Sequence, residues 1–362
     1  MTDFVQSTVQ HGLGILTLDR PQALNSLSLD MVRSLTRALL DWRSDTNVRA
    51  VLVRSASSKA FCAGGDIRFF YDAGRAAPSG GSAQLEDFFS EEYSLNHLIH
   101  HYPKPYIALM DGVVMGGGMG IAQGGADSRL RIVTERTKMA MPEVNIGLFP
   151  DVGGSFFLSR LRDKLGTWLG LTGEVIGAAD ALHAGLADLF VPSAELANLL
   201  VLLDRNDADH RAVARNFAAQ FAAQAQPQDS MLAQASACIA RHFTHASVAG
   251  IMDSLARDED PFAQHTLAVM QKRSPVMMCV TLEQLRRGAE LGIADCLRME
   301  RTMVRRSFEQ SEILEGVRAL VIDKDNAPAW SPRTLEEVTP GMVAHFFRPA
   351  WPAWAHPLRS LA

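Results

Sequence analysis

Two acidic residues in one apolar, glycine-rich segment are the strongest candidates for chemistry in this sequence. The segment MPEVNIGLFPDVGG (residues 141–154) carries Glu143 directly after one proline and Asp151 directly after another. A carboxylate without a partner is costly among apolar side chains, so an acid kept there usually has a partner or a task. Two carboxylates in one pocket would also raise each other's pKa, which helps one of them to carry a proton near neutral pH. For Asp151 alone, capping of a helix that begins near Val152 is an equally good interpretation.

Two glycine-rich turns are the second candidate feature. FCAGGD (61–66) and MGGGMG (115–120) each follow a strand-like run and precede a helical pattern. Turns of this kind can direct backbone N–H groups into a cleft. If two such groups converge on one carbonyl oxygen, each stabilises the negative charge that develops there by about 3 kcal/mol. A simple tight turn explains either motif alone equally well.

Other kinds of active site find little support. The sequence contains no GxGxxG, GxxxxGK or GxSxG motif, which disfavours a dinucleotide site, a nucleoside-phosphate site and a serine hydrolase. His242 and His245 form an isolated pair for which a solvated helix face is a better interpretation than a metal site. The four cysteines lack CxxC spacing, so we expect no metal, no disulfide framework and a reducing compartment.

The composition limits the kinds of partner that the protein is expected to bind. Of the 362 residues 47% are hydrophobic, which is enough for a sizeable core, and the net charge of −5 comes without a basic run that would bind nucleic acid. No apolar stretch reaches the roughly eighteen residues of a membrane span, and the first residues do not resemble a secretory signal. These features predict a cytoplasmic protein that binds neither nucleic acid nor membrane.

The hydrophobic pattern predicts two regions. Strand-like runs at 14–20, 49–55, 104–112 and 129–135 alternate with helical patterns such as the one at 29–42, which Ser28 is placed to cap. A Gly-, Ala- and Ser-rich segment at 72–83 is expected to form a mobile flap. From about residue 194 the pattern becomes Ala- and Leu-rich and helical. We therefore predict an α/β core over 1–193 and a mostly helical region over 194–362, for which mere structural support is an equally good interpretation.

Three of these segments resemble the crotonase superfamily, also called the enoyl-CoA hydratase/isomerase family. They are KAFCAGGDI (59–67), DGVVMGGGMGI (111–121) and MPEVNIGLFPDVGG, and the likeness extends over nearly the whole chain. EGVRALVIDKDNAPAWSP (315–332) is similar to a C-terminal extension found in the superfamily's thioester hydrolases and absent from its ordinary hydratases. The resemblance implies a spiral of ββα units that binds an acyl-CoA thioester.

The resemblance also implies roles for individual residues. The N–H groups of Gly65 and Gly117 would form an oxyanion hole, Glu143 would attack the thioester or activate water, and Asp151 would orient the substrate hydroxyl or protonate the departing thiolate. Substrate contacts are implied for Glu92 near the acyl end, for Asp66, whose main role is to hold its loop, and for Leu24 and Ala63 at the coenzyme A site, where RPQALNSLS (20–28) resembles the family's lining segment.

One departure from the hydratases bears on the activity. The first of their two glutamates matches Gly120 here, and Asp151 stands where hydratases usually have glycine. This departure disfavours addition of water to a double bond and favours hydrolysis of a thioester. The resemblance implies that the substrate is 3-hydroxyisobutyryl-CoA or a similar short hydroxyacyl-CoA, as in valine breakdown. Coenzyme A is then part of the substrate, and no cofactor or metal is expected. The alternatives are an enoyl-CoA hydratase or isomerase and a non-catalytic acyl-CoA binding protein. A homo-oligomer is an open expectation, because the superfamily forms trimers but the extension would cover the surface that they use.

Overall fold

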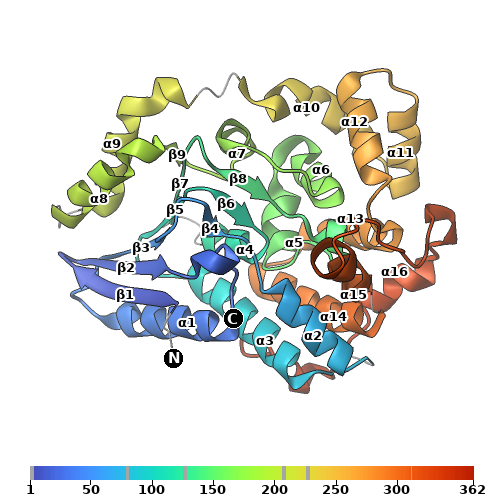
Figure 1. The fold of residues 1–362 in the computed structure, drawn as a ribbon, viewed down its shortest axis with the longest axis horizontal. Helices are drawn as coiled ribbons and strands as arrows, with labels where there is room; N and C mark the ends of the chain where they lie inside the picture. The colour runs from blue at the N-terminus through green and yellow to red at the C-terminus, as the bar shows by residue number, and fades with distance from the viewer. Residues whose placement is uncertain (1–3, 79–80, 125–128, 206–208, 226–228, 311) are drawn as a thin grey trace. The chain divides into compact units, whose positions relative to one another are not determined.

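The structure is a computed structural model that describes residues 4–78, 81–124, 129–205, 209–225, 229–310 and 312–362. Figure 1 shows its elements along the chain. The strands are β1 (Val5–Gln10), β2 (Leu13–Leu18), β3 (Ala50–Ser55), β4 (Ala60–Cys62), β5 (Tyr106–Met110), β6 (Val113–Met115), β7 (Arg129–Val133), β8 (Lys138–Ala140) and β9 (Leu189–Phe190). The helices are α1 (Leu29–Ser44), α2 (Ile67–Ala76), α3 (Ala83–His100), α4 (Gly117–Gln123), α5 (Gly154–Phe157), α6 (Leu165–Thr172), α7 (Ala178–Ala184), α8 (Leu196–Arg205), α9 (His210–Ala218), α10 (Met231–His242), α11 (Val248–Ala256), α12 (Pro261–Met270), α13 (Pro275–Gly288), α14 (Ile293–Gln310), α15 (Glu312–Val317) and α16 (Pro340–Phe346).

The strands form two sheets that the chain visits in turn. The larger sheet has the order β1-β2-β3-β5-β7-β9, and the smaller one has the order β4-β6-β8. Among the named strands of the described residues, β1 and β2 pair antiparallel and the other pairs are parallel. Each strand of the larger sheet from β3 to β7 is followed by one of the smaller sheet, so the chain winds as repeated ββα units. This arrangement confirms the predicted α/β spiral.

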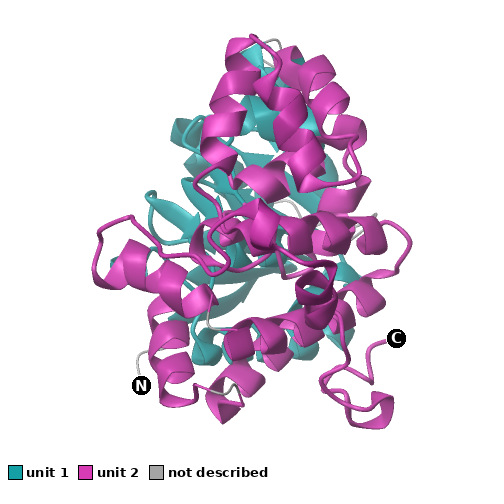
Figure 2. Cartoon of the chain, turned by 90° about the vertical axis from the view of Figure 1, so that its right-hand side faces the viewer, with its two compact units in different colours: residues 1–65, 95–140, 175–233 teal, residues 66–94, 141–174, 234–362 magenta. Residues whose placement is uncertain are grey.

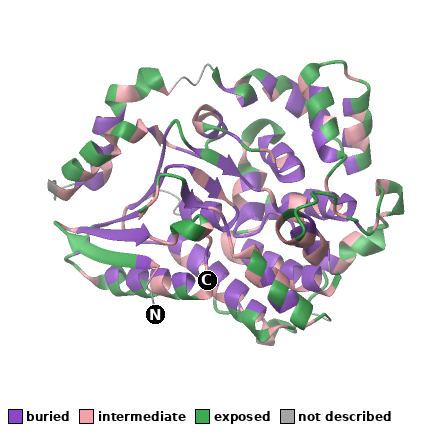
Figure 3. Ribbon diagram, viewed as in Figure 1, coloured by how far each residue is buried: buried purple, intermediate pink, exposed green. Residues whose placement is uncertain are grey.

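The core of the larger sheet follows the two-residue period of its strands. Alternate residues of β2, β3, β5 and β7 lie in one buried cluster, which α8 and α9 complete from one side; its strand members are Leu13, Ile15, Ala50, Leu52, Ile107, Leu109, Leu130 and Ile132. Figure 3 shows the contrast at the sheet edge, where β2 is buried along its length and β1 is exposed after its first residue. The central strands are therefore continuous apolar runs, as parallel strands covered on both faces require.

The chain divides into two compact units that interleave along the sequence (Figure 2). Unit 1 contains residues 1–65, 95–140 and 175–233, which include every strand found in the described residues. Unit 2 contains residues 66–94, 141–174 and 234–362. The boundary that we predict between 193 and 194 falls inside unit 1, and that division stays a prediction. Beyond Phe190 the described residues contain helices and loops but no strand, as the pattern predicts.

Most local predictions are confirmed. The four strand-like runs correspond to β2, β3, β5 and β7, and α1 begins after Ser28, whose hydroxyl accepts a hydrogen bond from Met31 N. The irregular segment expected at 72–83 is wrong for residues 72–76, because α2 continues to Ala76. Residues 79 and 80 of that segment lie outside the described residues. Among the helices that the structure describes, none combines the length and the apolar character that crossing a membrane demands.

Candidate active site

The two glycine turns meet in unit 1 because the strands before them pair in parallel. Strands β4 and β6 are neighbours, with Cys62 opposite Val114, so the turns that follow them leave the sheet at the same end. A Cβ atom on Gly64 would lie 3.3 Å from Met115 O and 3.7 Å from Gly117 N, and one on Gly118 would lie 2.2 Å from Cys62 O. Only residues without a side chain allow this approach.

The amides of Gly65 and Gly117 are candidates for binding a ligand. Gly117 is the first residue of α4, where an N–H group has no partner within the helix. In the described part of the chain neither amide donates a backbone hydrogen bond, and Gly65 is only half-buried. Two donors on adjacent turns are what an oxyanion hole needs, although their role in holding an oxyanion stays a prediction.

The segment 20–28 is fastened to the first glycine turn. Ala63 N donates to Leu24 O at 3.1 Å, and Leu27 N donates to Gly64 O at 2.7 Å. Asn25, fully buried with a φ of 56°, donates from Nδ2 to the carbonyl oxygens of Ala60 and Phe61 and so fixes the segment. The sequence interpretation missed this asparagine. Leu24 keeps 41% of its surface exposed and lies next to Ala63, and contact of these two residues with coenzyme A stays a prediction.

Glu143 is a buried acid of unit 2 with one unpartnered oxygen. It begins the 3₁₀ helix Glu143–Ile146 after Pro142, is 6% exposed, and its Oε2 atom has no hydrogen-bond partner within the described residues. Burial is the largest cause that raises the pKa of Glu143 well above its ordinary value, and the nearby charges of Asp151 and Glu92 add to it. A buried carboxyl with a free oxygen and a raised pKa is suited to attack or to take up a proton.

Asp151 is held by a tyrosine and does not cap a helix. α5 begins only at Gly154, its N-cap residue is Gly153, and no side chain caps it, so the capping interpretation of Asp151 is wrong. The Tyr93 hydroxyl, which is fully buried, donates to Asp151 Oδ2 at 2.6 Å. Burial raises the pKa of Asp151 to about 6, while the hydrogen bond from Tyr93 opposes the rise. Asp151 can therefore change its protonation state near neutral pH.

Glu92 belongs to the same cluster. It lies on α3, is 2% exposed, and its Oε1 atom has no partner in the part of unit 2 that the structure describes. Burial and then the charge of Asp151 raise the pKa of Glu92 well above its ordinary value. Asp66 differs, since it caps α2 by accepting from Phe69 N at 3.3 Å and is half-buried. Its structural role agrees with the prediction that it holds the loop.

Sequence reasoning missed the residues that hold the Asp151 loop. Glu300, on α14, is fully buried and accepts hydrogen bonds from Gly153 N at 2.7 Å and from Ser155 N at 2.9 Å. Gln284, on α13, donates to Pro150 O at 2.6 Å. No local signal could have found these residues, because each lies well over one hundred positions from its partner in helices of ordinary mixed composition.

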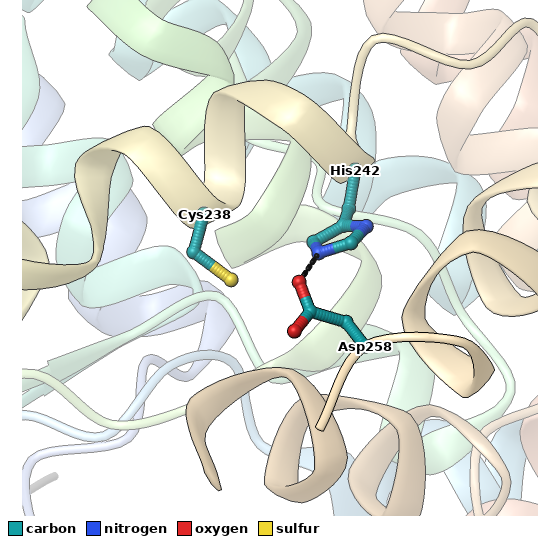
Figure 4. Close-up of side chains that lie close together, drawn as sticks. All are labelled: Cys238, His242 and Asp258. Atoms are coloured by element: carbon teal, nitrogen blue, oxygen red, sulfur yellow. Dashed lines mark hydrogen bonds and ion pairs between the residues drawn. The ribbon is translucent and has the colours of Figure 1, made fainter. Parts of the chain in front are cut away.

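One group of side chains in unit 2 has the residue types of a metal site. Cys238, His242 and Asp258 offer ligand atoms within 4.8 Å of one another (Figure 4). His242 already shares hydrogen bonds with Ser254 Oγ at 2.8 Å and with Asp258 Oδ2 at 2.9 Å, and Asp258 also contacts Arg241. Burial and the neighbouring acids raise the pKa of the Cys238 thiol, which disfavours the thiolate that a metal binds. His242 is buried, so the interpretation as a solvated helix face is wrong for this residue. We interpret the group as a set of contacts that joins α10 to α11 and to the loop after it, and we assign it no metal.

Comparisons with known proteins place these features in context. The family model described as enoyl-CoA hydratase/isomerase matches residues 13–347. The mitochondrial 3-hydroxyisobutyryl-CoA hydrolase of Gallus gallus is 39% identical over 343 residues, covering 94% of this chain and 87% of that protein. The protein of the same name from Homo sapiens is 37% identical over 339 residues, covering 92% and 86%.

Solved structures with other names are equally similar. A carnitinyl-CoA dehydratase from Mycobacterium thermoresistibile has a TM-score of 0.89 and 38% identity, covering 97% of this chain and 98% of that one. An enoyl-CoA hydratase from Rhodobacter sphaeroides has a TM-score of 0.85 and 37% identity, covering 96% and 98%. The names of the relatives thus include both hydrolases and hydratases.

The comparisons correct one expectation. We predicted a cytoplasmic location, but the hydrolases of Gallus gallus, Rattus norvegicus and Homo sapiens all carry the word mitochondrial in their names. The cytoplasmic assignment is therefore contradicted. The residues that could do chemistry fall into two sets, with Gly65, Gly117, Leu24 and Ala63 in unit 1 and the acids in unit 2.

Proposed function

Because the chain belongs to the enoyl-CoA hydratase/isomerase family, we propose that it hydrolyses 3-hydroxyisobutyryl-CoA, or a similar short hydroxyacyl-CoA, to the free acid and coenzyme A. The reaction would serve valine breakdown, and coenzyme A would enter only as part of the substrate. The observation that carries the proposal is the buried Glu143 with one unpartnered oxygen, beside a second acid that titrates near neutral pH.

The chemistry assigns one task to each group. Glu143 either attacks the thioester carbonyl, which gives an anhydride that water then hydrolyses to the free acid, or takes a proton from a water that attacks the carbonyl directly. In both routes the carbonyl oxygen becomes negatively charged. The Gly65 and Gly117 amides would stabilise that oxygen, each by about 3 kcal/mol. When the C–S bond breaks, Asp151 gives its proton to the thiolate, or it instead holds the substrate hydroxyl while the thiolate leaves. The proposal thus assigns the acids and the amides to one thioester.

A hydratase is the second candidate, because two similar solved proteins carry hydratase or dehydratase names. Against it stands Gly120, a buried residue of α4 at the position where the resemblance implies the hydratases' first glutamate. A glycine supplies no carboxylate to activate water. Incubation with crotonyl-CoA and with 3-hydroxyisobutyryl-CoA distinguishes the two activities: we expect free thiol from the second substrate and no loss of enoyl absorbance from the first. A loss of enoyl absorbance without thiol would establish the hydratase.

The Glu143→Gln variant tests the role of the acid and separates an enzyme from a binding protein. Glutamine keeps the shape of the side chain but can neither attack nor accept a proton, so hydrolysis should fall at least about 1000-fold while the Kd for coenzyme A is kept. Glu312→Gln is the control, because Glu312 is equally buried but its oxygens accept from Ser274 Oγ and Ser331 N. Unchanged turnover of Glu143→Gln would refute the role that we give this residue.

A further inference from the structure

We propose that Glu300 is a positioning residue that fixes the Asp151 loop for the reaction. The inference rests on the proposed hydrolase function and deepens it by assigning a task to the C-terminal helices. Glu300 lies on α14 within the region that the sequence suggests as mere structural support. It would not touch the substrate but would act through the loop that carries Asp151.

The Asp151 loop has a backbone that needs external support. Val152 has a φ of 53° and Gly153 has a φ of 89°, and a β-branched residue such as valine rarely adopts a positive φ. Such a conformation persists only where the surroundings determine it, and it is often found at functional sites. The residue directly after Asp151 is therefore held in a conformation that it would not choose alone.

Two helices supply that support on both sides of Asp151. Glu300 Oε2 accepts from Gly153 N at 2.7 Å, and its Oε1 accepts from Ser155 N at 2.9 Å and from the Ser155 hydroxyl. On the other side, Gln284 Nε2 donates to Pro150 O at 2.6 Å. The backbone before and after Asp151 is thus fixed by side chains, and the direction of the Asp151 carboxyl follows from it.

The chemistry of Glu300 also couples it to the other acids. Both of its oxygens face N–H donors, so an amide in its place would turn a donor toward a donor. Its charge is one of the causes that raise the pKa of Glu143 and of Tyr93. The pKa of Glu300 itself is about 8, so this charge is present only at higher pH. The readout that a merely structural role would not give is a fall in kcat without a matching change in KM.

The Glu300→Gln variant tests the proposal. We expect kcat to fall about 100-fold, since a displacement of about 1 Å in a catalytic group has that effect, while KM changes less than about threefold. Wild-type Glu300 loses its proton near pH 8 and then adds a charge close to Glu143, so a change that the wild-type pH profile shows near pH 8 should be absent in Glu300→Gln. Independently of activity, hydrogen exchange should become faster at the backbone amides of 152–155 and stay unchanged along α13.

Two further variants, at Asp180 and Ser155, serve as the control and as the alternative test. Asp180 is also buried and accepts from a serine hydroxyl (Ser230) and a backbone N–H (Leu232), but it lies in unit 1, so Asp180→Asn should keep the wild-type pH profile. Ser155→Ala, which removes only one of the three hydrogen bonds to Glu300, decides the question if Glu300→Gln does not fold, and we expect a loss in kcat of about tenfold.

Two results would distinguish a failure of the role proposed for Glu300 from a failure of the proposed hydrolase function. A folded Glu300→Gln variant with wild-type kcat, pH profile and exchange would overturn the positioning role while leaving the hydrolase intact. If instead the wild-type protein released no thiol from any hydroxyacyl-CoA, the proposed function would fail, and the exchange of 152–155 in Glu300→Gln would still decide whether Glu300 fixes the loop.

Discussion

Removal of the Tyr93 hydroxyl should reveal which protonation state of Asp151 the reaction uses. The Tyr93 ring packs against Phe89 with 5.9 Å between centroids, and Phe89 packs in turn on Phe308, so Tyr93→Phe should keep the ring in place. What disappears is one hydrogen bond of 2.6 Å, from the hydroxyl to Asp151 Oδ2. Because the bond lies in the interior, no bulk water replaces the lost donor.

The size of the effect follows from the energy of a hydrogen bond to a charged acceptor. Such a bond contributes about 1.5–3 kcal/mol, and one pKa unit corresponds to about 1.4 kcal/mol. Its loss destabilises the carboxylate and not the protonated acid. The pKa of Asp151, which is about 6 in the wild-type protein, should therefore rise by roughly one to two units in Tyr93→Phe.

The pH profile of kcat/KM then distinguishes the two roles of Asp151. If Asp151 protonates the departing thiolate, the protonated acid is the active form, so the high-pH limb near 6 should move up by one to two units. If Asp151 accepts a hydrogen bond from the substrate hydroxyl, the carboxylate is active, and the low-pH limb should make the same move. The assay measures release of free thiol from 3-hydroxyisobutyryl-CoA between pH 5 and 9. Each reaction is stopped and brought to one fixed pH before the thiol reagent is added.

Tyr102→Phe is the matched control. Tyr102 is also buried, and its hydroxyl donates at 2.9 Å to a backbone oxygen, that of Leu39, and not to an acid. Its removal should cost stability but leave both limbs where they are. If Tyr93→Phe folds and neither limb moves, Asp151 is not the group that titrates in the reaction, and the reasoning that gives it a proton-carrying role is refuted.

Two further predictions concern stability. Gly118→Ala should lower the free energy of unfolding, measured in urea, by about 1–3 kcal/mol, because its Cβ atom would lie 2.2 Å from Cys62 O. In the control Gly341→Ala the nearest contact of the new Cβ atom is at 3.7 Å, so the free energy of unfolding should change by less than about 1 kcal/mol. Equal effects of the two substitutions would show that the glycine turns can move apart. Burial raises the pKa of Glu300 from 4.5 to about 8, so the folded protein retains a proton that the unfolded chain releases. The contribution of Glu300 to the unfolding free energy is therefore complete below pH 4.5 and is lost as the pH rises toward 8, by up to about 1.4 kcal/mol per pH unit. Urea titrations from pH 5 to 9 should show that the free energy of unfolding falls less steeply with pH in Glu300→Gln than in the wild-type protein. Identical slopes against pH would contradict a proton on Glu300.

The features that the sequence predicts well are those that depend on near neighbours. The apolar runs of β2, β3, β5 and β7 stand out because strands buried on both faces need continuous hydrophobic residues. The glycine turns are equally readable, since close approach of two backbones excludes side chains at Gly64 and Gly118. Glu143 was identifiable because a carboxylate in apolar company is expensive. In each case a short window contains the physical cause.

The features that the sequence does not reveal depend on partners far along the chain. Tyr93 reads as one more apolar residue of an amphipathic helix, because its hydroxyl matters only through Asp151, 58 positions later. Asp151 reads as a helix cap because a short window shows proline, aspartate and two glycines and not the tyrosine that binds it. The segment 72–76 reads as a flexible loop, although tertiary packing of Gly74 against Leu314 and Phe308 keeps it helical.

These long-range contacts change how the helical region after residue 194 should be interpreted. A buried carboxyl with a pKa of about 6 needs a fixed surrounding, since loss of its hydrogen-bond partner would move its pKa by about one unit or more. The loop of Asp151 cannot provide this alone, because Val152 is held at a positive φ. Support comes from Gln284 and Glu300, so the helices α13 and α14 belong to the acid cluster as much as the loop does. A shortened chain that lost them would keep the sequence motif of the acids while losing the rigid backbone that makes it useful.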